Sequence, residues 1–163
     1  MIINIKKQKY GIFLISVLTL LIIDLVSKYY LLHANFGEIV VIKNFFKITM
    51  HTNNGVAFGI FFGHTIQLII SITIVGLLAY FGFKYFSGKN KFYSKMLLGI
   101  IIGGAIGNVI NRIHLGYVID FISLWKFPVF NIADIGITVG LIILLILNWQ
   151  EEAPHQSNLS SSA

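Results

Sequence analysis

Long apolar stretches dominate the sequence and restrict it to folds that bury them in lipid. About 20 apolar residues cross the hydrocarbon core of a bilayer, and four stretches approach that length, at about 10–32, 65–86, 96–113 and 131–149. Hydrophobic residues make up 56% of the chain and charged residues only 11%, which is atypical of soluble domains. We therefore predict one all-α membrane domain over residues 1–163, with four transmembrane helices.

The positive charge of the chain follows the apolar stretches. The net charge is +6, and its lysines lie mostly beside the predicted spans, which is typical of membrane topology rather than of a nucleic-acid partner. Seven basic residues lie at the N-terminus and in the 84–95 connection, and five elsewhere. This bias favours cytoplasmic termini. The polar residues of interest then share the outer face: Asp24, Asn53, Asn108, Arg112, Asp120, Asn131 and Asp134.

The polar connection over residues 33–63 contains two short stretches with the composition of β-strands. Residues 38–42 (EIVVI) and 45–50 (FFKITM) are rich in β-branched and aromatic side chains, with a turn-like Lys43–Asn44 between them. We predict a small β-sheet on the membrane surface over about 36–56, with a turn at 53–55 near its end. Residues 114–130 are predicted to form a loop, and the polar tail over 151–163 is predicted to be disordered.

Charged residues gather between Gly103 and Asp134, which include the only arginine and two of the six acidic residues. A carboxylate just inside the membrane boundary, as predicted for Asp134, is costly unless it is neutral, paired or facing a polar cavity. Asp120 precedes it by 14 positions, on the same side of the membrane. We predict that the two carboxylates meet, share a proton and activate water. The alternatives are helix N-terminal stabilisation by Asp134 and an ordinary loop or capping role for Asp120.

The third span has two distinct faces. Small residues recur every four positions, which predicts close contact with a neighbouring helix, at Gly99, Gly103 and Gly107. Asn111 continues this stripe and is predicted to face a packed helix. On the adjacent face, Asn108 can join helices or contact substrate. Arg112 can anchor at headgroups, or its planar guanidinium can bind carbonyl or carboxylate groups.

The remaining polar residues indicate no other chemistry. Asp24 and Lys28 lie four residues apart in the first span, which predicts an ion pair within that helix. The chain has no cysteine, and its histidines lack metal-ligand spacing. We therefore predict no metal and no cofactor.

Several motifs together resemble a known family. The segments GGAIGNVINR, VIDFI and FPVFNIAD, with NNGVAF upstream and IIDLVSK in the first span, resemble bacterial lipoprotein signal peptidase, also called signal peptidase II. The resemblance runs from about Asp24 to Thr138. It implies an intramembrane aspartyl endopeptidase of the bacterial cytoplasmic membrane, with four spans, an extracytoplasmic β-cradle and an active site near the outer face. Its substrates would be prolipoproteins, cut before a diacylglyceryl-modified cysteine.

The resemblance also implies roles for individual residues. The catalytic pair falls on Asp120 and Asp134. Substrate contacts fall on Asn53, Gly55, Asn108, Arg112 and Asn131. Supporting roles fall on Asp24, Lys28 and Asn111. The implied partners are diacylglyceryl-prolipoproteins and membrane lipids, with no cofactor, and the protein is expected to be monomeric.

Three positions depart from the family pattern. Asn111 stands where the family usually has aspartate, Leu25 where it often has glutamine, and Val56 where it has alanine. These departures motivate a second hypothesis, a catalytically weak paralogue that binds lipoprotein precursors or inhibitors. A third is a small transporter with a proton relay through Asp24 and Asp134. The gathering of polar groups on one face argues against that third hypothesis.

Overall fold

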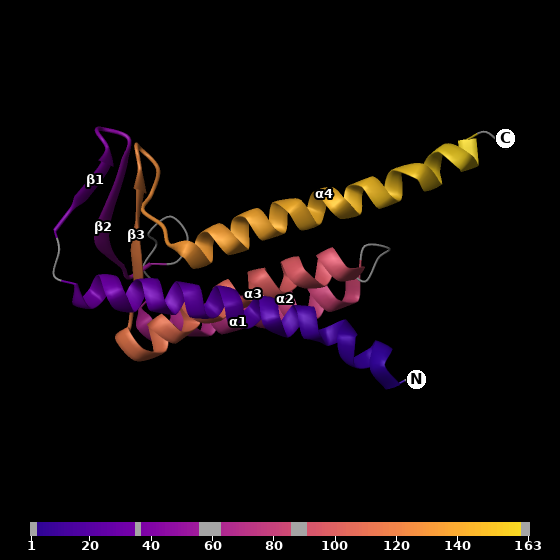
Figure 1. Cartoon of the computed structure of the whole chain (residues 1–163), viewed down its shortest axis with the longest axis horizontal. Coiled ribbons are helices and arrows are strands. Elements are labelled where there is room, and N and C mark those ends of the chain that lie inside the picture. The colour runs from indigo at the N-terminus through magenta and orange to yellow at the C-terminus, as the bar shows by residue number, and fades with distance from the viewer. Residues whose placement is uncertain (1–2, 35–36, 56–62, 86–90, 161–163) are drawn as a thin grey trace.

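The described part of the chain forms four helices and one small sheet. A computed structural model describes residues 3–34, 37–55, 63–85 and 91–160. The helices are α1 (Ile3–His33), α2 (His64–Tyr85), α3 (Lys91–Leu115) and α4 (Ile132–Ser160). The sheet lies at one end of the helices, and both chain ends lie toward the other (Figure 1).

Among the described residues, three helices are long and apolar enough to cross a membrane. Their apolar stretches are Tyr10–His33, His64–Lys84 and Phe92–Leu115. A shorter apolar stretch, Ile132–Leu147, lies within α4. The first three predicted spans therefore coincide with suitable helices, and a fourth crossing by α4 stays a prediction.

Helix α3 is the centre of the bundle, because it contacts α1, α2 and α4. Its glycines face α1, as the small-residue stripe predicts. A Cβ atom at Gly103 would lie 2.5 Å from the carbonyl oxygen of Val17, and one at Gly107 would lie 2.5 Å from Asp24 Oδ2. On the next face, a Cβ at Gly104 would lie 2.7 Å from the carbonyl oxygen of Ala133 at the start of α4. The glycines thus permit helix contacts that any side chain would block.

The three strands form an antiparallel sheet in the order β1-β2-β3. They are β1 (Ile39–Ile42), β2 (Phe46–Asn53) and β3 (Val118–Leu124). The prediction that residues 114–130 form only a loop is therefore wrong. Strand β3 pairs with a segment about 70 residues earlier, and such long-range pairing leaves no local periodic signal in so short a stretch.

Other element ends also differ from the prediction. Strand β2 continues to Asn53, so this residue belongs to a strand rather than to a turn. Helix α4 continues to Ser160, whereas the tail from residue 151 is predicted to be disordered. Pro154 lies in this extension and donates no backbone hydrogen bond, so local helix propensity does not explain it. Part of the predicted surface sheet, residues 35–36 and 56, lies outside the described residues.

The contact between α1 and α3 gives a stability prediction. Gly103→Ala should destabilise the protein by about 1–3 kcal/mol, because the added methyl group overpacks a backbone contact. Thermal unfolding in detergent measures this loss. The matched control is Gly76→Ala on α2, where a Cβ meets nothing within 4 Å. Equal stability of the two variants would contradict the close contact.

Candidate active site

The first turn of α4 holds Asp134 through a reciprocal pair of hydrogen bonds. The backbone N–H of Asp134 donates to Asn131 Oδ1 at 3.0 Å, and the backbone N–H of Asn131 donates to Asp134 Oδ2 at 3.2 Å. This is the arrangement of a capping box, in which two N-terminal residues satisfy each other's free donors. Asp134 therefore does stabilise the helix start, as the alternative interpretation expects. Its other oxygen, Oδ1, accepts from Asn108 Nδ2 at 2.9 Å.

Strand β3 carries the second carboxylate, Asp120, which is only 2% exposed. Asn53 on the neighbouring strand donates to its Oδ2 at 2.8 Å, and Asn131 donates to its Oδ1 at 2.6 Å. Burial raises the pKa of Asp120 above its ordinary value, and the negative charge of Asp134 raises it further. The hydrogen bonds from Asn53 and Asn131 oppose this shift.

Asn131 joins the two carboxylates. It is completely buried, its side-chain amide binds Asp120, and its carbonyl oxygen and backbone N–H bind Asp134. The structure therefore brings together the two acidic side chains that the sequence analysis paired, one from β3 and one from α4. A single asparagine sets their relative position.

A buried ion pair supports this arrangement from α1. Lys28 Nζ lies 2.7 Å from Asp24 Oδ2, and both residues are at most 1% exposed, so the predicted pair is present. Each charge has a second partner. Asp24 Oδ1 accepts from the backbone N–H of Ala133 at 3.0 Å, and Lys28 Nζ donates to Asn108 Oδ1 at 2.8 Å. Asn108 thus binds Lys28 on α1 and Asp134 on α4, which makes it a connection between three helices.

Arg112 lies beside this network, on the side of the sheet. One terminal nitrogen donates to the carbonyl oxygen of Gly55 at 3.2 Å, and the other to the carbonyl oxygen of Asn108 at 3.4 Å. Within the part of the chain that the structure describes, its buried Nε has no hydrogen-bond partner. Gly55 is itself held by Asn53, whose Oδ1 accepts from the Gly55 N–H at 2.9 Å.

Asn111 has a different environment from the one predicted. It is 7% exposed, and its Oδ1 accepts from the backbone N–H of Ile119 in β3 at 3.3 Å. The expectation of a helix–helix contact is therefore corrected to a helix–strand contact. The position needs a hydrogen-bond acceptor, which both asparagine and aspartate provide.

Both carboxylates line a cavity of about 1020 Å³ between the sheet and the helices. Its polar side includes Asn108 and Arg112, and its apolar side includes Ile74, Ile137 and residues 127–130. Residues 127–130 had no predicted role, because aromatic and proline residues in a loop indicate no particular chemistry. His51 was not predicted either; it pairs with Asp120 across β2 and β3 and lines the same cavity.

The two carboxylates of this site lie in different surroundings. No cluster of three or more potential metal-ligating side chains occurs among the described residues. Two carboxylates in different environments, one buried in a strand and one at a helix N-terminus, are the usual means of separating an acid from a base.

Comparison with known proteins identifies the family. A family model described as signal peptidase (SPase) II matches residues 16–150. The chain belongs to the signal peptidase II family. It is therefore a hydrolase of the aspartic peptidase class, as the resemblance implies.

Individual relatives agree with this family assignment. The chain is 39% identical to a lipoprotein signal peptidase of Clostridium tetani, covering 86% of this chain and 94% of that protein. It is 36% identical to a lipoprotein signal peptidase of Staphylococcus aureus (strain Newman), covering 86% and 90%. A solved structure of a bacterial membrane enzyme superposes with a TM-score of 0.75 at 35% identity, covering 88% of this chain and 90% of that one. The protein is accordingly a bacterial membrane protein.

The buried ion pair gives a second stability prediction. Lys28→Met should cost about 3–5 kcal/mol, because it leaves Asp24 as an unpaired buried charge. Lys47→Met is the matched control. It breaks an ion pair with Glu38 of similar length, 2.6 Å, whose side chains are 44% and 43% exposed, and such surface pairs contribute about 0–1 kcal/mol. Thermal unfolding in detergent compares the two variants, and equal losses would contradict the supporting role of Lys28.

The raised pKa of Asp120 gives a prediction for the pH dependence of stability. In the unfolded chain an aspartate ionises at about pH 3.9, whereas folded Asp120 holds its proton to higher pH. Its contribution to stability is therefore greatest at low pH and is lost as the pH rises through the folded pKa. Asp120→Asn should remove this component. The unfolding temperature of the wild type, relative to Asp120→Asn, should fall as the pH is raised, and a flat or opposite difference would contradict the burial effect.

Proposed function

We propose that this protein is an intramembrane aspartyl endopeptidase that removes signal peptides from bacterial prolipoproteins. The supporting observation is the pair of carboxylates, Asp120 and Asp134, joined by Asn131 in a large cavity at one end of the helix bundle. The relatives named lipoprotein signal peptidase support prolipoproteins as the substrate class. Cleavage before a diacylglyceryl-modified cysteine follows from the family resemblance.

In the proposed resting state, Asp120 carries the shared proton and Asp134 is ionised. The raised pKa of Asp120 supports this assignment. Asp134 lies in the first turn of α4 and accepts hydrogen bonds from the Asn131 N–H and the Asn108 side chain. Neutral Asp120 can donate a hydrogen bond to the scissile carbonyl, and ionised Asp134 can accept a proton from water.

The proposed reaction has two steps, addition of water and cleavage of the carbon–nitrogen bond. Water adds to the carbonyl carbon, its proton moves to Asp134, and the Asp120 proton moves to the carbonyl oxygen, which gives a neutral tetrahedral diol. Asp134 next protonates the amide nitrogen, the carbon–nitrogen bond breaks, and Asp120 recovers a proton from the diol. Both carboxyl groups return to their starting states.

Arg112, Asn108 and Asn131 are proposed to hold the peptide backbone of the substrate, together with Asn53 and Gly55. The contact between Arg112 and the Gly55 carbonyl supports this role for Arg112, because it is already oriented to bind a peptide carbonyl at 3.2 Å. Asn108 and Asn131 also bind the catalytic groups, so their substitution should affect both positioning and binding. Asp24, Lys28 and Asn111 are proposed to act through the structure alone.

The proposed topology has four crossings and cytoplasmic termini in the bacterial cytoplasmic membrane. The two chain ends lie at the same end of the bundle (Figure 1), which fits an even number of crossings. The sheet and the carboxylates lie at the opposite end, so the active site would be near the outer face. Substrate would then enter from the outer leaflet, and we propose that the enzyme acts as a monomer.

The weak-paralogue hypothesis loses its main support at Asn111. The observed role of this side chain is to accept a hydrogen bond from Ile119, which an asparagine performs without a charge. The departure from the family pattern at this position therefore does not argue for lost catalysis.

Cleavage of a diacylglyceryl-prolipoprotein by the purified protein tests the proposal. Asp120→Asn and Asp134→Asn should each abolish turnover, because each removes a group that transfers a proton in both steps of the proposed reaction. Glu38→Gln is the matched control, since it neutralises an exposed carboxylate outside the cavity. Retained turnover in either aspartate variant would contradict the dyad. Tight precursor binding without turnover by the wild type would instead favour the paralogue.

A further inference from the structure

The three-stranded sheet has one strongly apolar face. Two rows of paired residues cross the three strands. One row is Ile39, Ile48 and Ile122, and the other is Ile42, Phe46 and Leu124. Directly paired residues in antiparallel strands project to the same face. Six apolar side chains therefore form a continuous surface, here called the apolar ledge: Ile39, Ile42, Phe46, Ile48, Ile122 and Leu124. Its outer members, Ile39 and Ile42, are 44% and 53% exposed.

The apolar ledge continues the face that carries the catalytic carboxylate. Asp120, Ile122 and Leu124 alternate along β3, so they share a face. The strands run across the helix axes, and their far ends extend past the bundle (Figure 1). If the helices cross the membrane, the strands lie along its surface, and the ledge faces the lipid beside the active site.

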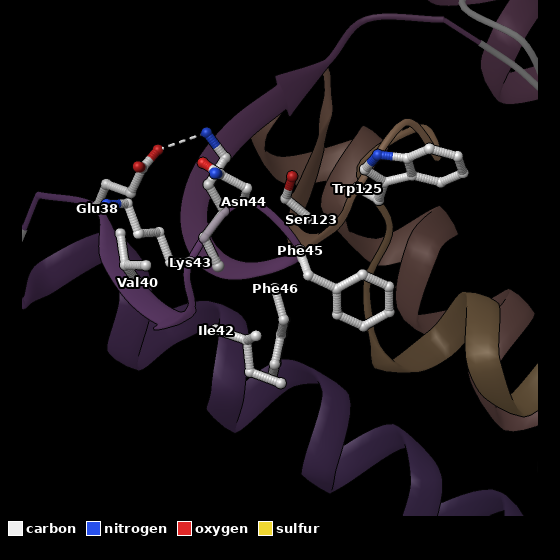
Figure 2. Close-up of a pocket in the computed structure, with 10 residues that line it drawn as sticks. Glu38, Val40, Ile42, Lys43, Asn44, Phe45, Phe46, Ser123 and Trp125 are labelled. Carbon is white, nitrogen blue, oxygen red and sulfur yellow. Dashed lines mark hydrogen bonds and ion pairs between the residues drawn. The ribbon is translucent and has the colours of Figure 1, made fainter.

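The opposite face of the sheet is mixed, because Ile119 and Phe121 of β3 lie on it and are buried. Val40, Lys47 and Ser123 share it by register, and Lys47 forms the exposed ion pair with Glu38. A pocket of about 340 Å³ lies near the β1–β2 turn, lined by Glu38, Lys47 and Ser123 and also by Ile42 and Phe46 of the ledge. Figure 2 shows Glu38 with its ion pair and Ser123, while Ile42 and Phe46 lie next to each other. The exposed ion pair therefore lies on the face opposite the apolar ledge.

The far end of the sheet carries exposed aromatic and basic side chains. Phe45 and Trp125 are 53% and 68% exposed, and the two turns are joined by a hydrogen bond from the Trp125 N–H to the Phe45 carbonyl oxygen at 2.6 Å. Lys126 Nζ lies 5.1 Å from the centre of the Trp125 ring, and Lys43 is exposed in the β1–β2 turn. Tryptophan and lysine together are characteristic of the membrane–water interface.

We propose that the apolar ledge and this aromatic end lie in the headgroup region of the adjacent leaflet, where Lys43 and Lys126 bind the phosphate groups of anionic phospholipids. Contact with the upper part of the acyl chains removes the apolar surface from water. Each lysine is attracted to the negative charge of anionic headgroups. The lipid would then hold the sheet, and Asp120 with it, at a constant height above the bundle.

The tryptophan content of the chain allows a direct test. The sequence has two tryptophans, so Trp149→Phe leaves Trp125 as the only reporter. In bilayers, Trp125 fluorescence should be quenched by lipids with bromine near the top of the acyl chains. Its emission should shift to the blue when phosphatidylglycerol replaces phosphatidylcholine, and high salt or the double variant Lys43→Gln/Lys126→Gln should remove that shift. Lys84→Gln, near the end of α2 away from the sheet, is the matched control and should leave the shift unchanged.

Three outcomes would overturn the proposal. In the first, aqueous acrylamide quenches Trp125 freely and brominated lipid has no effect. In the second, Trp125 fluorescence does not respond to anionic lipid or to the lysine variants. In the third, Trp125 is shielded only after precursor peptide is added. The last result would assign the surface to substrate. The fluorescence readout does not require turnover, so it can be repeated in Asp134→Asn. Failure of this proposal is therefore distinguishable from failure of the proposed function.

Discussion

The buried ion pair between Asp24 and Lys28 is the interaction on which the rest of the site depends. Two charges removed from water are costly, and their attraction offsets that cost only when the remaining hydrogen-bonding positions are also filled. Here the second partners are Ala133 at the start of α4 and Asn108 on α3. The need to satisfy the pair therefore sets the position of both helices relative to α1, and Asn108 transmits that position to Asp134.

Close helix packing makes this network possible. Asp24 lies against Gly107, where a Cβ atom would approach its carboxylate to 2.5 Å, so the glycine stripe is needed for the ion pair as well as for the backbone contact at Gly103. The strand side of the site is held in a different way. Asn111, at the end of α3, accepts a hydrogen bond from Ile119 and so aligns the strand that carries Asp120. Helix α3 thereby positions both carboxylates.

The environments of the two aspartates differ in a way that suits their proposed roles. Asp120 is buried in a strand and accepts hydrogen bonds from two side-chain amides, whereas Asp134 is half-buried and belongs to a helix N-terminus. The proposed contact of the sheet with lipid would also help to position Asp120, since the membrane would hold the apolar ledge, and with it strand β3, over the bundle. Membrane position and catalytic geometry would then be coupled through one strand.

The sequence by itself determined the membrane class, the helices, the glycine stripe and the i,i+4 ion pair, because each depends on local length or on helical periodicity. The motifs also indicated which two aspartates belong together. Only the tertiary structure decided how they are joined: strand β3, the role of Asn131 between the carboxylates, the second partners of the ion pair and the contact of Asn111 with Ile119. These features depend on pairing between segments far apart in the chain, and such contacts leave no periodic pattern in either segment.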